Sequence, residues 1–152
     1  MSLLLVTLIL CRPVGPDDIP PPFTGERADL AAAPIESFLT GAEHNMVKAI
    51  NARRAEAGLE PLAVHPRLLE AARVHARWMA STGSNVHGRS PGGFNAWGEN
   101  IAWGQSTSSK AVLTWMNSPG HRANILGRYK YIGVAGYQRP GGPIKWCAQF
   151  AR

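Results

Sequence analysis

The sequence has few cysteines with which to cross-link its fold by disulfide bonds. Of its 152 residues only Cys11 and Cys147 are cysteines, and they lie near opposite ends of the chain. Two cysteines so placed argue against the disulfide framework of small secreted domains, so the fold must depend on a hydrophobic core. We expect Cys147, which follows Trp146, to be a small buried side chain in a strand.

Long apolar runs are also absent. Residues 3–10 read Leu-Leu-Leu-Val-Thr-Leu-Ile-Leu, well short of the roughly 20 residues that span a bilayer. We expect no spanning helix beyond this segment, and we assign residues 1–11 to a signal-peptide-like segment, although no Lys or Arg precedes the run. It predicts a secreted, periplasmic or cell-envelope protein. Lipid attachment at Cys11 is the less favoured alternative, because Leu10 stands where a small residue is needed.

The chain lacks any dense run of Lys and Arg interleaved with aromatics, although its net charge is +6. Such scattered basic residues argue against nucleic acid as a partner. A basic surface favours anionic lipid headgroups or wall polymers instead. We expect a monomer whose partner is a cell-envelope component, a lipid or another protein.

Residues 12–36 are rich in proline, with three consecutive prolines at 20–22. Consecutive prolines favour an extended, solvated backbone and remove amide donors, so we assign this stretch to a linker. The folded domain is placed at residues 37–152, which is long enough to bury one hydrophobic core.

The first half of the domain has the pattern of two helices. Thr40 and Glu43 have the spacing of a capping box, and Gly58 is suited to end the helix that follows. Pro66 suits the first turn of a second helix, which ends near Gly83. His75 falls in the apolar stripe of this second helix, where we interpret it as a satisfied core histidine rather than a ligand.

The second half begins with a long segment rich in Gly, Ser and Asn, residues 81–109, which we predict to be a functional loop. A short helix capped by Ser108 or Ser109 comes next. The pattern then changes to strands at 131–137 and 144–150, separated by the turn-forming residues 139–143. Helices followed by such a hairpin predict an α+β domain.

Three titratable side chains stand in turn-forming sequence rather than inside a regular element. They are His87, Glu99 and His121. Loops carry such groups because a rigid scaffold can direct them to one point. The sequence therefore predicts that these three side chains converge on a polar site.

Several segments then occur in a recognisable order. Residues 51–62 read Asn-Ala-Arg-Arg-Ala-Glu-Ala-Gly-Leu-Glu-Pro-Leu, residues 98–102 read Gly-Glu-Asn-Ile-Ala, and residues 115–126 read Trp-Met-Asn-Ser-Pro-Gly-His-Arg-Ala-Asn-Ile-Leu. With the closing strands they resemble the CAP superfamily (cysteine-rich secretory proteins, antigen 5 and pathogenesis-related 1) in its bacterial SCP-domain form. The resemblance covers residues 41–152.

The resemblance implies a three-layer α-β-α sandwich with a central antiparallel sheet. It also implies a cleft holding two histidines and two acids, of which His87, Glu99 and His121 are present here. The second acid has no counterpart, because Asn117 and Ser118 follow the helix instead. The residues that we expect to support the cleft come from the same segments: Asn100, Ser118, Arg122 and Asn124.

Three roles stay open for the cluster. His87, Glu99 and His121 can hold Zn²⁺ or another divalent metal, weakly because they come from separate loops. Chemistry at such a site would be hydrolytic, and a Ser118–His121 nucleophile is a less favoured route. Alternatively, Glu99 accepts hydrogen bonds from both histidines and serves only to tie the loop to the domain.

A binding module is the second class of function. The resemblance implies proteins that act outside the cell, among which lipid binding, sterol binding and protein partners are known. Trp97 and Trp103 flank Glu99, and these two rings either line an apolar groove or anchor the loop in the core.

Overall fold

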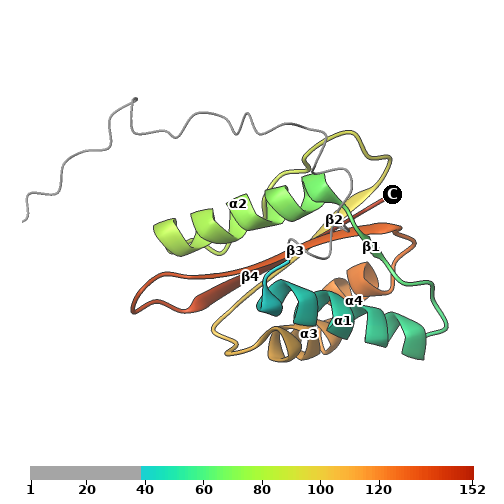
Figure 1. Ribbon diagram of the computed structural model, residues 1–152, viewed down its shortest axis with the longest axis horizontal. Coiled ribbons are helices and arrows are strands. Elements are labelled where there is room, and N and C mark those ends of the chain that lie inside the picture. Colours follow the sequence, from blue (N-terminus) through green and yellow to red (C-terminus); the bar gives the residue numbers. More distant parts are fainter. Residues whose placement is uncertain (1–38) are drawn as a thin grey trace, which may run out of the picture. The chain divides into compact units, whose positions relative to one another are not determined.

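The computed structural model describes residues 39–152 as three layers (Figure 1). Helix α2 (Pro66–Thr82) covers one face of a sheet, and α1 (Gly41–Glu56), α3 (Ser108–Met116) and α4 (Pro119–Ile125) cover the other. This arrangement is the predicted α-β-α sandwich. The predicted signal-like segment 1–11 and linker 12–36 lie outside the described residues. Within residues 39–152 no helix is long and apolar enough to cross a membrane.

The sheet has four strands in the order β1-β3-β4-β2. Strands β2 (Trp97–Trp103), β4 (Ile144–Ala151) and β3 (Tyr131–Gln138) pair antiparallel, as predicted for the central sheet. The two-residue strand β1 (Ala63–Val64) adds to β3 in parallel, so the sheet as a whole is mixed. Strand β1 was not predicted, because two residues are too few to show an alternation of apolar and polar side chains.

The helix ends follow the residues that were expected to form them. Thr40 and Glu43 exchange both hydrogen bonds of the capping box at the start of α1. Helix α2 has Pro66 in its first turn and ends at Gly83, whose φ of 76° is in the left-handed region. One cap differs from expectation, since the side chain of Thr107, rather than that of Ser108 or Ser109, caps α3.

The long predicted loop 81–109 is wrong in part, because it contains the edge strand β2. Its sequence, Trp-Gly-Glu-Asn-Ile-Ala-Trp, carries Gly, Glu and Asn, which are poor strand formers. The strand forms because β4 supplies a complete antiparallel partner, with Glu99 opposite Gln149 and Ile101 opposite Cys147. Tertiary pairing therefore overrides local preference here.

The core divides into two clusters, one on each side of the sheet. The larger cluster lies under α1, α3 and α4 and includes Trp115, Phe150 and Met46. The smaller lies under α2 and includes Met79 and Cys147, whose side chain is wholly buried as predicted. Side chains along β2 and β4 alternate between the two clusters. This alternation decides which residues of the polar site can meet.

Candidate functional site

The site centres on Glu99, a carboxylate that is buried on the α2 side of β2. Its Oε1 accepts hydrogen bonds from the backbone N–H of Gly88 at 2.8 Å and pairs with His87 Nδ1 at 2.9 Å. Its Oε2 accepts from Gln149 Nε2 at 3.1 Å and lies 3.6 Å from Cys147 Sγ. Both carboxylate oxygens are therefore engaged, and Glu99 binds the loop after α2 to the sheet.

His75 completes this half of the site from the face of α2. Its Nε2 lies 3.0 Å from the carbonyl oxygen of Val86 and 3.9 Å from Glu99 Oε1. Its ring stacks on Trp78, with the centroids 5.5 Å apart. A partnered, mostly buried ring agrees with the interpretation of His75 as a satisfied structural histidine. His75 also holds the loop that carries His87 against α2.

The thiol of Cys147 is not a reactive group. Burial raises the pKa of the Cys147 thiol well above its ordinary value, and the neighbouring Glu99 carboxylate raises it further. The thiol stays protonated at neutral pH and acts as a weak donor toward Glu99.

His121 approaches from the opposite layer. Its Nδ1 lies 2.9 Å from Ser118 Oγ, and among residues 39–152 it makes no hydrogen bond with Glu99. We expected Glu99 to accept hydrogen bonds from both histidines, and of these two, within the described residues, it pairs with His87 only. The reason is the strand alternation, since Glu99 points toward α2 whereas Asn100 points toward α4. Strand β2 lies at the edge of the sheet, so the two layers meet around it.

The supporting residues tie α4 to that edge strand. Asn100 Nδ2 donates to the carbonyl oxygen of His121 at 2.9 Å. Asn124 Nδ2 donates to the backbone oxygen of Glu99 at 3.2 Å and to Asn100 Oδ1 at 2.9 Å. Asn100, Asn124 and Ser118 therefore lie in contact with Glu99 or His121.

Arg122 does not support the site, because it is exposed and its side chain makes no hydrogen bond within the described part of the chain. Arg54 of α1 takes that role and was missed. Its Nη1 donates to the carbonyl oxygens of Ile125 and Gly127 at 2.8 and 2.9 Å, which holds the end of α4. Nothing in the sequence distinguishes Arg54 from the neighbouring Arg53. Gln149 was also missed, although a glutamine inside an apolar strand is a readable signal.

The electrostatics distinguish His121. Burial lowers its pKa below the ordinary value, and the nearby His87 lowers it further because two positive imidazoles repel. His121 is thus neutral at pH 7. Since its folded-state pKa is depressed, its protonation costs stability only as the pH falls below about 6.5, the ordinary pKa of histidine.

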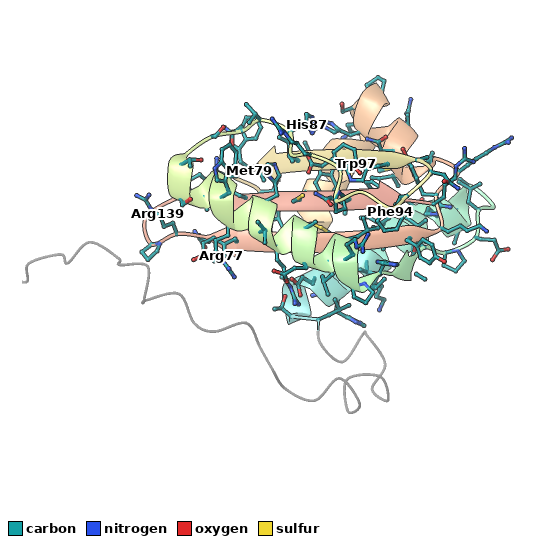
Figure 2. The ribbon with its side chains drawn as sticks, turned by 90° about the horizontal axis from the view of Figure 1, so that it is seen from above. Arg77, Met79, His87, Phe94, Trp97 and Arg139 are labelled. Atoms are coloured by element: carbon teal, nitrogen blue, oxygen red, sulfur yellow. The ribbon has the colours of Figure 1, made fainter. Side chains whose placement is uncertain are left out.

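An open apolar groove lies beside the Glu99 cluster, between α2 and the loop that follows it. Its volume is about 380 Å³. Its lining includes Val74, Trp78, His87 and Arg89. Val74 is 54% exposed and Trp78 is 41% exposed, although both are apolar side chains. Figure 2 shows His87 in this loop.

The two tryptophans that flank Glu99 behave differently. Trp97 is half-buried, and its Nε1 is enclosed without a hydrogen-bond partner among the described residues. Trp103 is 49% exposed and lines two hollows at the other end of β2. Trp97 thus anchors the chain, whereas Trp103 presents its ring to solvent. Neither lines the groove beside His87.

The number of side chains that can act as ligands limits how tightly the site could bind a metal ion. Glu99 orients Nδ1 of His87 and Ser118 orients Nδ1 of His121, an arrangement that leaves Nε2 of each ring for a metal ion. Among residues 39–152, however, no group of three or more His, Cys, Asp and Glu side chains is placed around one point. Two imidazoles fit a weak site only, because zinc sites ordinarily use three or four protein ligands.

Comparison with known proteins agrees with these features. Residues 47–150 match the sequence profile of the CAP group, described as the cysteine-rich secretory protein family. YkwD of Bacillus subtilis, an uncharacterised protein, is 33% identical over 142 residues, which is 85% of this chain and 54% of YkwD. The chain therefore spans about half the length of this curated relative.

Solved structures show the same fold. An extracellular SCP-domain protein of Bacillus anthracis superposes with a TM-score of 0.67 at 26% identity, covering 74% of this chain and 40% of that one. An outer surface protein of Borrelia burgdorferi gives 0.65 at 18% identity, covering 71% and 90%. Venom allergen-like protein 4 of Schistosoma mansoni gives 0.61 at 13% identity, covering 74% and 90%.

Proposed function

The chain belongs to the cysteine-rich secretory protein (CAP) family, and from this premise we propose that it is an exported binding module. The proposed ligand is an amphipathic molecule such as a lipid, whose apolar part occupies the groove between α2 and the loop carrying His87. The extracellular SCP-domain relative from Bacillus anthracis supports export. The signal-like sequence of residues 1–11 supports it independently.

The observation that carries this proposal is the exposed apolar lining of the groove. Val74 and Trp78 are 54% and 41% exposed, and both line this groove. Gathered apolar surface of this kind commonly marks a ligand or partner site. Arg89 adds a cation to the lining, which would stabilise an anionic headgroup.

Binding is favoured over hydrolysis by the state of Glu99. A general base needs a free lone pair directed toward substrate or water. Both oxygens of Glu99 are already held, Oε1 by His87 and Gly88 and Oε2 by Gln149. The second acid of the family cleft is absent, with Asn117 and Ser118 in its place. The cluster therefore serves best as a structural support for the groove wall.

The groove predicts a specific loss of lipid affinity. Replacing Trp78 by alanine is expected to weaken binding of dodecanoate by about tenfold, since the aromatic contact with the bound chain is lost. Isothermal titration below the micelle concentration measures it on the full chain. The matched control is Leu113→Ala, which removes an apolar side chain of 52% exposure from α3 in the opposite layer. Equal affinity of Trp78→Ala and wild type, or an equal loss in both variants, would refute the groove as the lipid site.

The two histidines are proposed in addition to bind Zn²⁺ or another divalent ion weakly through their Nε2 atoms. Zinc affinity is expected to be measurable at pH 7.5 and to fall by about tenfold or more at pH 5.5, because protonated imidazoles do not ligate. A His87→Ala/His121→Ala double variant removes the binding, whereas His44→Ala, on exposed α1 surface, leaves it unchanged. Calorimetry measures both. Zinc binding that survives in the double variant would place the metal elsewhere.

A further inference from the structure

A second hollow, which shares no lining residue with the groove, lies at the C-terminal end of α2. Its volume is about 510 Å³. It is enclosed by the last turn of α2 and the residues after it, by the end of β2 and by the turn between β3 and β4. Figure 2 places Arg139, in that turn, at the same end of the domain as the last turns of α2. No Asp or Glu lines it, and its polar lining is as follows: Ser81, Thr82, Asn85, Arg139 and Lys145.

Lys145 of β4 is the unusual member of this lining, because only 3% of its surface is exposed. Its Nζ lies 3.5 Å from the carbonyl oxygens of Gly83 and Ser84, and it donates a short hydrogen bond to Asn85 Oδ1. Within the described residues no carboxylate pairs with it. A buried ammonium held by neutral oxygens alone keeps its positive potential, and a ligand anion can supply the missing opposite charge.

Arg139 adds a second cation. Its Nη1 donates to the carbonyl oxygen of Ser81 at 3.2 Å, and its other guanidinium nitrogens make no hydrogen bond within residues 39–152. Part of the charge on Arg139 and Lys145 is balanced by the carbonyl groups at the end of α2. That balance is partial, since a helix terminus carries only about half an elementary charge. The hollow is therefore positive overall.

Trp103 supplies a flat surface at the same place. Its side chain is 49% exposed at the end of β2, and Lys145 Nζ lies 5.7 Å from the centroid of its ring. An exposed aromatic face beside hydroxyl and amide groups suits a sugar ring, whose C–H face packs on the aromatic while its hydroxyls form hydrogen bonds. A carboxylate on that sugar would lie close to the positive charges of Arg139 and Lys145.

We propose that this hollow binds an acidic saccharide, a sugar ring bearing a carboxylate, as found in anionic polysaccharides. Trp103 would carry the ring face, and the guanidinium of Arg139 would bind the carboxylate through charge-assisted hydrogen bonds. Lys145, whose N–H groups are already taken by Gly83, Ser84 and Asn85, would contribute its positive charge. This site is separate from the lipid groove and does not depend on it. A domain with both sites can hold a wall-type polymer and an amphipathic ligand at neighbouring positions along α2.

The test uses the full chain and the linear trimer of galacturonic acid, with its fully methyl-esterified form as the neutral partner. The acid is expected to bind at least about tenfold more tightly than the ester, because charge-assisted hydrogen bonds are about twice as strong as neutral ones. Trp103→Ala and Arg139→Gln are each expected to weaken binding of the acid by about fivefold to tenfold. Titration followed by amide chemical shifts measures affinities in this range.

Leu113→Ala is the control, since it removes an exposed apolar side chain from α3 in the opposite layer, and it is expected to leave the affinity for the trimer unchanged. Trp103 and Arg139 are exposed, so both variants should fold, and far-ultraviolet circular dichroism checks this. Equal affinity for the acid and the ester overturns the proposal, and so does trimer binding that neither Trp103→Ala nor Arg139→Gln alters. A trimer that fails to bind at millimolar concentration overturns it as well.

Discussion

Replacing Glu99 by alanine is expected to lower the free energy of unfolding by about 3–5 kcal/mol, the range found when one partner of a buried polar or ionic group is removed. The variant leaves the N–H of Gly88, Nε2 of Gln149 and Nδ1 of His87 without their acceptor. It also releases the loop that forms one wall of the groove. Urea unfolding followed by tryptophan fluorescence measures the loss.

Glu99→Gln is the matched control, because it keeps the shape of the side chain. Its amide can occupy the Oε2 position and donate to Gln149, whose own Oε1 is buried without a partner among the described residues. Gln149 needs only to rotate its amide for that bond to form. We expect a loss of about 1 kcal/mol or less. A loss below 1 kcal/mol in Glu99→Ala itself would show that the cluster does not stabilise the loop.

The second large effect is expected at Gly133, in β3 directly beneath α2. A Cβ added there would lie 2.0 Å from the carbonyl carbon of Leu68 and 2.2 Å from the backbone nitrogen of Leu69. These are backbone atoms of α2, so the clash can be relieved only by moving the helix away from the sheet. Gly133→Ala is therefore expected to cost about 3 kcal/mol or more, the upper end for overpacking a core. It should also separate His75 from Glu99.

Gly120→Ala tests whether the effect comes from the close approach or from the loss of a glycine. Gly120 lies in α4, and an added Cβ there meets nothing within 4 Å. This variant is expected to be neutral or to gain up to about 1 kcal/mol, since alanine is the better helix former. Urea unfolding curves of Gly133→Ala and Gly120→Ala measure the two changes in the free energy of unfolding. A Gly133→Ala variant as stable as Gly120→Ala would mean that α2 packs less tightly than described.

The elements that could be predicted are those whose signals are local. The capping box of Thr40 and Glu43, the proline at the start of α2 and the alternation in β3 and β4 each depend on residues adjacent in sequence. Strand β2 could not be predicted in this way, because its pairing with β4 joins residues that are far apart in the chain. No short stretch of sequence therefore predicted β2, the edge strand that carries Glu99.

The site, too, has features that could be predicted from the sequence and features that could not. The sequence identified His87, Glu99 and His121 through their turn-forming surroundings and through the family resemblance. It did not reveal that Glu99 and His121 belong to opposite sides of β2, or that Gln149 and Cys147 enclose the carboxylate. Strand alternation and the register between β2 and β4 produce that arrangement. Arg122 was expected at the site and Arg54 was not, since exposure depends on how α4 packs.

The sequence by itself therefore determined the helices, the closing hairpin, the family and the residue types of the polar site, because caps, turns and periodicity act over a few residues. Only the tertiary structure decided that Glu99 is fully hydrogen-bonded, that Trp78 and Val74 form a groove, and that Lys145 is buried beside Trp103 without a carboxylate. These properties depend on which side chains meet across the sheet. Burial and hydrogen-bond partners are set by that long-range packing, which no short stretch of sequence encodes.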